Sequence, residues 1–427
     1  MDKKVRVGIL GLGTVGSAIP FLLKEQQNKI EKMTKVSIEI EKVFVRNIAS
    51  KKMIADKFNL NLTSDISDIL ENDDIQIVIE VMGGTELAKE SIITALKNKK
   101  HVITANKDLM AQHGTELEKI AQENKCCLYY EAAVAGGIPI LRTISNNYKV
   151  DKITSVYGIV NGTTNYMLTQ MTKQNWTYNE ALNEAQKLGF AESDPKNDVE
   201  GIDAAYKMVI LTKFCFGMGL DMKQVSTQGI TKVTLRDIQL ANALGYQIKL
   251  LGSSKLTSKG IITEVSPLLV PNNHPLASVE NEMNAVFINS VGMEETMYYG
   301  PGAGANPTAT SILSDLLSVI ELMDQTENIL PFSSFYEGLT LANQAEIMSK
   351  YFLTFELENT EKMIEEIKMI IDMTCSNVVH FQTQITEGKK LEMIILIDKI
   401  TSQQLKELID NIRNKYKINN EVSYKLI

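Results

Sequence analysis

The stretch VRVGILGLGTVG (5–16) decides the fold of the N-terminal part of the chain. Its first half, Val5–Leu10, is an apolar run of strand length, and its second half has the spacing GxGxxG. A helix predicted from about Thr14 and a strand predicted at Ile38–Val45 complete a βαβ unit. In that setting the glycines permit a tight turn, close approach of a pyrophosphate and close helix packing. The segment therefore predicts a dinucleotide site that includes Gly11, Leu12, Gly13, Thr14, Val15 and Gly16.

Strands and helices continue to alternate as far as about residue 135, which predicts a doubly wound parallel sheet of the Rossmann type. We place a first domain at residues 1–135 and expect a helix at about 305–325 to return and pack on it. The predicted strands are Ile75–Val81, His101–Ala105 and Cys127–Tyr130, and the predicted helices are Glu86–Asn98 and Thr115–Asn124.

Two further units follow. After Gly136-Gly137 the mixture of helices and strands predicts an α+β domain at 136–304 that serves substrate binding and dimerisation. Residues 349–427 predict the order βαββαβ, which is the ferredoxin-like split motif. The elements of this third unit are predicted at Tyr351–Leu357, Glu361–Met373, Val378–Ile385, Leu391–Ile397, Gln403–Asn414 and Val422–Leu426.

The composition excludes several classes of protein. The chain has 427 residues, with 44 Lys and Arg against 52 Asp and Glu, so its net charge is −8. This mild acidity argues against nucleic acid or an anionic membrane as the main partner and favours a small-molecule substrate. No apolar run reaches 18 residues and no export signal is visible, so we expect a cytoplasmic protein without a membrane span. The four cysteines, Cys126, Cys127, Cys215 and Cys375, show no CxxC spacing that would suggest zinc.

The end of the second predicted strand bears on the choice of cofactor. Sites that prefer NAD place Asp or Glu there for the ribose 2′-hydroxyl, whereas this chain has Val45-Arg46-Asn47. Arg46 is suited to a 2′-phosphate, so we expect NADP, with NAD still open. The alternative is that Arg46 is an ordinary arginine facing solvent.

Two segments offer candidates for acid–base chemistry. Thr104-Ala105-Asn106-Lys107 ends a predicted parallel strand at the sheet edge where ligands bind, although Lys107 is also compatible with a surface loop. The carboxylate-rich segment 189–201 precedes a helix predicted at Ile202–Phe216. On that helix Asp203 and Lys207 share one face, as a substrate-binding pair or as an exposed ion pair. Glu192 and Asp198 nearby favour the first interpretation, because an amino-acid substrate needs carboxylates for its ammonium group.

At this point the sequence resembles the homoserine dehydrogenase family over residues 5 to 325. The matching motifs are GLGTVG (11–16), VITANK (102–107), YEAAVAGGIPI (130–140), GIVNGTTNYMLTQM (158–171), EAQKLGFAESDPKNDVEGIDAAYK (184–207) and YGPGAGANPTATS (299–311). The resemblance implies an enzyme that interconverts L-aspartate 4-semialdehyde and L-homoserine with NAD(P). It also implies roles for individual residues: Lys207 for acid–base catalysis, Lys107 beside nicotinamide and substrate, Glu192, Asp198 and Asp203 for the substrate, and Gly83, Thr104 and Gly304 for the cofactor.

The same resemblance implies a monovalent cation, sodium or potassium, on Glu131 and the carbonyls of Val134, Gly136 and Ile138. A glycine-rich hinge between domains is the other interpretation of that segment. Residues 349–427 resemble an ACT domain, although the segment 358–361 lacks the glycine usual in its effector loop. We therefore leave threonine binding open and expect a homodimer or homotetramer.

Two other functions compete with this prediction. An aspartate-semialdehyde dehydrogenase would need a nucleophilic cysteine, and Cys126 and Cys127 begin an interior strand where packing is the usual role. A nucleotide- and amino-acid-sensing protein without activity would not need Lys107 and Lys207, both of which are present.

Overall fold

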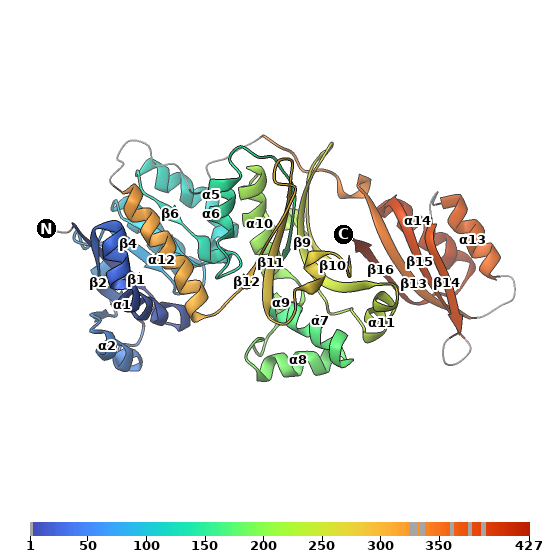
Figure 1. Cartoon of the computed structure of the whole chain (residues 1–427), viewed down its shortest axis with the longest axis horizontal. Helices are drawn as coiled ribbons and strands as arrows, with labels where there is room; N and C mark the ends of the chain where they lie inside the picture. Colours follow the sequence, from blue (N-terminus) through green and yellow to red (C-terminus); the bar gives the residue numbers. More distant parts are fainter. Residues whose placement is uncertain (1–2, 324–331, 333–337, 359–362, 375–377, 386–389) are drawn as a thin grey trace.

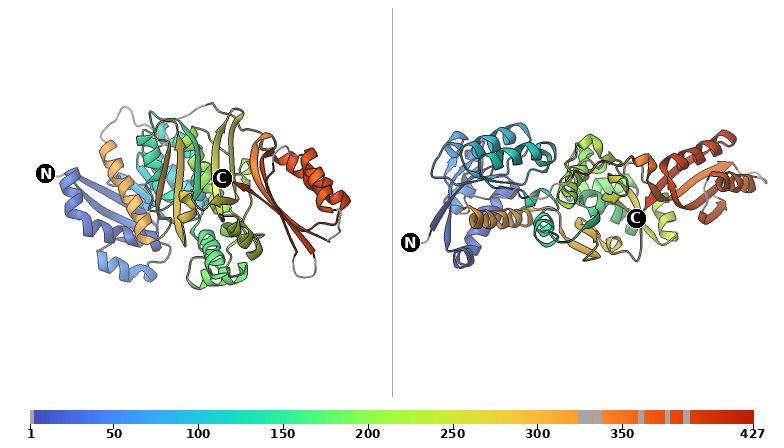
Figure 2. Two further views of the ribbon diagram at one scale, coloured as in Figure 1. Left: turned by 45° about the vertical axis from the view of Figure 1, so that its right-hand side comes forward. Right: turned by 90° about the horizontal axis from the view of Figure 1, so that it is seen from above.

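The computed structural model describes residues 3–323, 332, 338–358, 363–374, 378–385 and 390–427. Three units lie in a row, with the N-terminal sheet and the C-terminal unit at opposite ends (Figure 1, Figure 2). Cys375 and most of the effector-loop segment, residues 359–361, lie outside the described residues. Within the part of the chain that is described, no helix combines the length and hydropathy needed to cross a bilayer.

The N-terminal sheet, sheet A, is parallel throughout and has the strand order β3-β2-β1-β4-β5-β6. This is the order of a Rossmann sheet, so the predicted fold class is confirmed. The strands are β1 (Lys3–Leu10), β2 (Val36–Phe44), β3 (Leu62–Thr63), β4 (Ile77–Glu80), β5 (His101–Thr104) and β6 (Leu128–Tyr129), and the helices are α1 (Thr14–Thr34), α2 (Lys52–Phe58), α3 (Ser67–Leu70), α4 (Glu86–Lys97) and α5 (Lys107–Glu123).

The predicted start of α5 at Thr115 is wrong, since the helix begins eight residues earlier, at Lys107. The side chain of Asn106 accepts a hydrogen bond from the Leu109 N–H at 3.1 Å and so caps the first turn. Because of this cap, Lys107 stands at the start of a rigid helix rather than in a loop.

One face of sheet A is covered by a helix from far along the chain. Helix α12 (Ala305–Leu322) packs along α1 and lies among the N-terminal elements (orange among blue in Figure 1). Ile312 and Leu316 are fully buried in one apolar cluster with Val7 and Ile19 of the N-terminal βα unit. The first unit is therefore completed by residues that follow the second.

The central unit is built on the large sheet, sheet B, whose order is β12-β11-β7-β9-β10-β16-β13-β15-β14, with β8 beside β10. Its first strands are β7 (Ile153–Ile159), β8 (Ser226–Thr227), β9 (Tyr246–Thr257), β10 (Gly260–Pro271), β11 (Met283–Ser290) and β12 (Glu295–Pro301). Its helices are α6 (Ile140–Asn147), α7 (Gly162–Gln174), α8 (Tyr178–Lys187), α9 (Lys196–Val199), α10 (Ile202–Phe216) and α11 (Leu235–Ala243).

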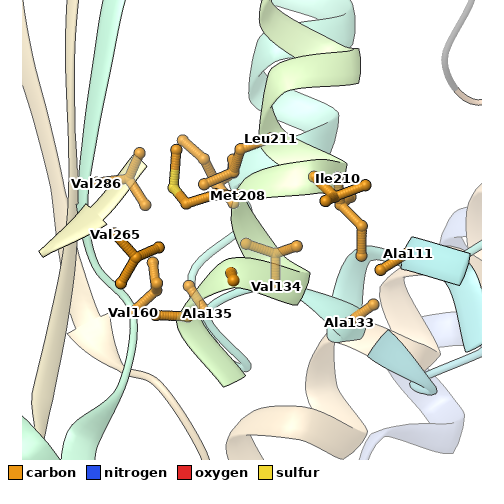
Figure 3. Packing of buried hydrophobic residues seen from close by; sticks show 14 of the residues in the cluster. Ala111, Ala133, Val134, Ala135, Val160, Met208, Ile210, Leu211, Val265 and Val286 are labelled. Carbon is orange, nitrogen blue, oxygen red and sulfur yellow. The ribbon is translucent and has the colours of Figure 1, made fainter. Parts of the chain in front are cut away.

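Helix α10 is buried between sheet B and the N-terminal unit. Met208 lies beside Val265 and Val286 of sheet B, while Ile210 faces Ala111 of α5 on the other side (Figure 3). A helix that is apolar on almost all sides is suited to such a place. Its polar first turn is left at the boundary between the two units.

The C-terminal unit has the predicted βαββαβ order, with β13 (Met348–Glu358), α13 (Met363–Thr374), β14 (Val378–Ile385), β15 (Lys390–Thr401), α14 (Ser402–Lys415) and β16 (Asn419–Leu426). Its two helices and one face of its strands share a separate apolar cluster. The other face, with Phe352, Leu396 and Tyr424, joins the core of the central unit. Strand β16 also pairs with β10, so sheet B runs through both units.

Candidate active site

A cleft of about 750 Å³ opens between the N-terminal unit and the central unit. Its walls come from the end of β5 and the start of α5, from the segment 132–136, from the first turns of α7 and α10, and from the glycine-rich segment before α12. Seven of the residues singled out in the sequence line it, namely Lys107, Gly136, Glu192, Asp198, Asp203, Lys207 and Gly304.

Asp203 is the centre of the charged groups in this cleft. The Nζ of Lys207 lies 2.7 Å from one oxygen of Asp203, and the Nζ of Lys107 lies 3.4 Å from the other. Lys207 also donates a hydrogen bond to the Val160 carbonyl at 2.5 Å. Asp203 and Lys207 are buried, and Lys107 keeps about a third of its side chain exposed. The i,i+4 pair is therefore not an exposed helix pair but part of a buried group of two lysines on one carboxylate.

Asn161 joins a second carboxylate to this group. Its side-chain amide donates to Asp198 at 2.7 Å and to Asp203 at 2.9 Å. Asn161 is not among the candidates predicted from the sequence. An asparagine just before a predicted helix indicates an N-cap. It does not indicate that the side chain also contacts carboxylates far along the chain.

Burial and neighbouring charges set the protonation of the cleft. Burial disfavours the charged form of Asp203, but Lys207 and Lys107 outweigh it and hold the pKa of Asp203 below its ordinary value. Burial also disfavours the ammonium of Lys107, yet the carboxylates around it, Asp203 foremost, raise its pKa. Burial raises the pKa of Asp198, and the like charge of Asp203 adds to that effect. The cleft thus combines an ionised carboxylate with one that takes up a proton more readily.

Glu192 lies on the exposed loop between α8 and α9, at the rim of the cleft. Its carbonyl accepts a hydrogen bond from the Gln186 side chain at 3.0 Å, which ties the loop to α8. The structure thus brings Glu192 to the same cleft as the lysines but at its edge.

The glycine-rich turn has the geometry that its motif predicts. Gly11 has φ +108°, and a Cβ on Gly16 would come within 2.3 Å of the Gly11 carbonyl, so both positions require glycine. A Cβ on Gly13 would meet nothing within 4 Å, which leaves open space at the N-terminus of α1. This space at a helix N-terminus, bordered by backbone N–H groups, fits a pyrophosphate. Arg46 is exposed two residues beyond Phe44, whose carbonyl accepts the Gly11 N–H at 3.0 Å.

The loops after β4 and β5 are tied together by a buried carboxylate. Glu80 accepts hydrogen bonds from the Thr104 hydroxyl at 2.6 Å and from the Met82 N–H at 2.8 Å. The Asn106 side chain donates to the Gly84 carbonyl at 2.6 Å, beside Gly83 with φ +75°. The sequence does not single out Glu80, because it ends an apolar strand and its hydrogen-bond partner, Thr104, belongs to the neighbouring strand β5.

The segment 131–138 connects the two units. Both oxygens of the Glu131 carboxylate accept backbone N–H groups from the start of α6, Leu141 at 2.8 Å and Arg142 at 2.7 Å. The Gly136 carbonyl accepts the Ser311 hydroxyl of α12 at 2.6 Å. Ala135 and Gly136 have positive φ, so the chain curls here.

The described cysteines are buried away from this cleft. Burial raises the pKa of the Cys126 thiol to about 11 and that of Cys127 to about 12. Cys215 is also buried, on α10. Among the cysteines that the structure describes, therefore, none has the character of a nucleophile, as an aspartate-semialdehyde dehydrogenase would require.

Comparison with known proteins agrees with this geometry. The family model "Homoserine dehydrogenase, NAD binding domain" matches residues 11–131, and the model "Homoserine dehydrogenase" matches residues 139–317. The homoserine dehydrogenase of Lactococcus lactis is 41% identical over 99% of this chain and 98% of its own.

Two solved structures extend the comparison. A homoserine dehydrogenase from Thiobacillus denitrificans superimposes with a TM-score of 0.94 at 31% identity, covering 100% of this chain and 98% of its own. A homoserine dehydrogenase from a hyperthermophilic archaeon, solved in complex with NADPH, has a TM-score of 0.63 at 25% identity and covers 74% of this chain and 97% of its own. The glycine-rich turn, the lysine–carboxylate cleft and these matches together show that the chain belongs to the homoserine dehydrogenase family.

Proposed function

We propose that this protein interconverts L-aspartate 4-semialdehyde and L-homoserine with NADP as its preferred cofactor. The observation that carries the proposal is the pair of lysines on Asp203, in a cleft that faces the Rossmann sheet. A reaction that turns an aldehyde into an alcohol needs positive charge and a proton donor where the oxygen becomes negative, and this pair supplies both.

A nicotinamide cofactor held at the glycine-rich turn would supply the hydride that reduces the aldehyde carbon in the reductive direction. The carbonyl oxygen gains negative charge, which the ammonium groups of Lys207 and Lys107 stabilise. Lys207 then donates the proton that completes the hydroxyl group, and Asp203 keeps Lys207 oriented through their 2.7 Å contact. Glu192 and Asp198 bind the ammonium group of the substrate from the rim and the wall of the cleft.

The residues of sheet A fit a dinucleotide. The space at Gly13 accepts the pyrophosphate. Gly83 and Thr104 lie at the carboxyl ends of β4 and β5, where such a cofactor binds, and Gly304 lines the cleft with Lys107. Arg46 is exposed beside the glycine-rich turn, as a contact to a 2′-phosphate requires. The archaeal relative in complex with NADPH supports the same cofactor here.

The test is an absorbance assay at the nicotinamide band, with homoserine and either NADP or NAD. We expect reduction of both cofactors, with a higher kcat/KM for NADP. Absence of homoserine-dependent reduction with both cofactors would refute the proposed reaction, and a preference for NAD would refute the role of Arg46.

We further propose that Glu131 and the carbonyls of Val134, Gly136 and Ile138 bind sodium or potassium. The support is the donor set, a carboxylate and carbonyl oxygens of the kind that a hard ion takes, on a segment curled by the positive φ of Ala135 and Gly136. Replacing all sodium and potassium in the buffer by tetramethylammonium should lower the thermal midpoint of the protein, and restoring either ion should reverse the change.

The chain's domain bounds, cellular location and oligomeric state are also proposals. We propose domains at 1–135, 136–304 and 349–427, the last an ACT-like unit, in a cytoplasmic homodimer or homotetramer. Sheet B supports self-association, because its edge strand β12 exposes Met297 and Tyr299. Light scattering of the purified chain measures the oligomeric state directly.

A further inference from the structure

We infer that Asn161 is a positioning residue for the reaction, holding Asp198 and Asp203 side by side in the cleft. The inference rests on the proposed function and adds to it a residue that touches neither substrate nor cofactor in the scheme above. The observation behind it is one amide group hydrogen-bonded to two carboxylates from different helices, α9 and α10.

The orientation of the Asn161 side chain is fixed by its own partners. Its oxygen accepts the Thr164 N–H at 2.9 Å and the Thr164 hydroxyl at 2.8 Å, and its nitrogen donates to the two carboxylates. Rotating the amide by half a turn would set oxygen against the carboxylates and nitrogen against the Thr164 N–H. All hydrogen-bonding groups of this buried side chain are therefore used in only one orientation.

The backbone around Asn161 is fixed as well. Asn161 is the N-cap of α7, and the preceding residue, Val160, offers its carbonyl to Lys207 at 2.5 Å. The following residue, Gly162, packs so closely that a Cβ would lie 2.7 Å from the Glu282 carbonyl. One short turn thus holds the ammonium of Lys207 through its backbone and the two carboxylates through a side chain.

Electrostatics explains why the cleft needs such a residue. Asp198 and Asp203 repel each other, and the two lysines contact Asp203 directly. Asp198 has Asn161 as its side-chain partner, and that hydrogen bond opposes the effects of burial and of Asp203 on its protonation. Without the amide, Asp198 would bind a proton at a higher pH and would bind an ammonium group less well.

The decisive variant is Asn161→Asp. Aspartate caps a helix as well as asparagine does and has the same shape, so α7 keeps its start, while the donor to both carboxylates is lost. We expect kcat/KM for homoserine to fall about 10–100-fold, the size expected when a buried charged acceptor loses its donor. The acid limb of its pH profile should move to higher pH. Asp198 and Asp203 bond directly to Asn161, and the other titratable groups that line the cleft with it are Lys107, Asp108, Glu192, Asp194, Tyr206, Lys207 and Glu282.

The matched control is Asn343→Asp. Asn343 is also an N-cap whose amide donates to a carboxylate, Glu346 at 3.1 Å, but it is exposed and lies outside the cleft. This variant should have the parent kcat/KM and pH profile. NADPH affinity, measured by fluorescence titration, should match the parent in both variants, because Asn161 does not border the glycine-rich turn.

A second variant covers the case in which Asn161→Asp does not fold. Thr164→Val removes the hydroxyl that orients the amide and leaves the backbone N–H, so it should give a smaller shift of the acid limb in the same direction. An unchanged pH profile in whichever of the two variants folds would overturn the inference, even if Lys207→Ala abolishes turnover. An inactive parent enzyme would instead refute the proposed function.

Discussion

Two surfaces for ligands, a backbone wall at the glycine-rich turn of sheet A and a charged wall in the cleft, are built by different means. The wall from sheet A presents glycines and backbone groups, with open space at Gly13 and positive φ at Gly11 and Gly83. The wall from the central unit presents charged side chains that are held by hydrogen bonds, with Asp203 between Lys207 of the same helix and Lys107, which reaches across from the start of α5. The backbone wall selects a ligand by shape, because glycines leave space for it, whereas the charged wall selects a ligand by electrostatic attraction. Substitutions on the two walls should therefore fail in different ways.

The largest effect is expected on the charged wall, at Lys207. Lys207→Ala should lower kcat by at least about 10²-fold, because the lost ammonium acts mainly in the transition state. Lys207→Arg should recover little, since arginine keeps the charge but does not readily release a proton. Steady-state kinetics with homoserine measures this, with NADPH titration as the control for binding. Near-parental turnover in the alanine variant would remove Lys207 from the mechanism.

On the backbone wall, Gly13→Val should impair cofactor binding, whereas Gly16→Val should impair packing of the folded protein. The Gly13 side chain would project into open space, so the free protein should keep its thermal midpoint while NADPH binding weakens by about 5–150-fold, the range of steric overpacking. A side chain on Gly16 would collide with the Gly11 carbonyl, so that variant should lose stability first. Equal thermal midpoints in the two variants would contradict this distinction.

Glu192 tests the rim of the charged wall. Glu192→Ala should raise KM for homoserine at least about tenfold, as expected for a lost hydrogen bond to a charged group, and change KM for the cofactor little. Glu192→Gln keeps the size of the side chain and should show most of the same effect, because the charge is what binds an ammonium group. If both KM values rise together, Glu192 does not belong to the substrate site.

Arg46 tests whether the backbone wall also uses charge. Arg46→Ala should weaken NADP about tenfold and leave NAD nearly unchanged, because only NADP carries the 2′-phosphate. The ratio of kcat/KM for the two cofactors is the measurement. A ratio that does not change on substitution would assign 2′-phosphate binding to another residue.

The smallest effect concerns Lys249 on β9, a buried lysine behind the charged wall. It donates to the Val279 carbonyl at 2.6 Å, and burial lowers its pKa to about 8. Because its pKa is lower in the folded state than in the unfolded one, its burial costs stability below pH 8, and this cost is relieved as the pH rises from 8 toward 10.5.

Lys249→Met removes that titration. The stability of the variant relative to the parent should therefore be higher at pH 7 than at pH 9.5, in urea unfolding followed by the single tryptophan, Trp176. A difference in stability that is the same at both pH values would show that Lys249 is charged throughout this range.

The contrast between the walls also explains what could be predicted from the sequence. The glycine-rich turn is local, so its geometry follows from twelve consecutive residues, and α10 was predicted with its observed bounds because glycines flank an apolar run. The strands predicted at Gln247–Leu251 and Ile261–Val265 run on to Thr257 and Pro271. Their apolar pattern ends at Gly252-Ser253-Ser254 and at Ser266-Pro267, which nevertheless pair inside the sheet. The contacts of Asn161 depend on three helices meeting, which no local pattern encodes.

Because α12 covers part of the N-terminal unit, that unit cannot be completed until the ribosome has made the central unit. Strand β6 leaves the ribosome long before α12, and the intervening residues, about 180 of them, take roughly 10–40 s to translate at typical rates. During that interval the surface of β1 and α1 that α12 will cover, with Val7 and Ile19, lacks this cover. The nascent chain therefore presents an apolar surface to chaperones until the central unit has been made, and the first 135 residues expressed alone should aggregate.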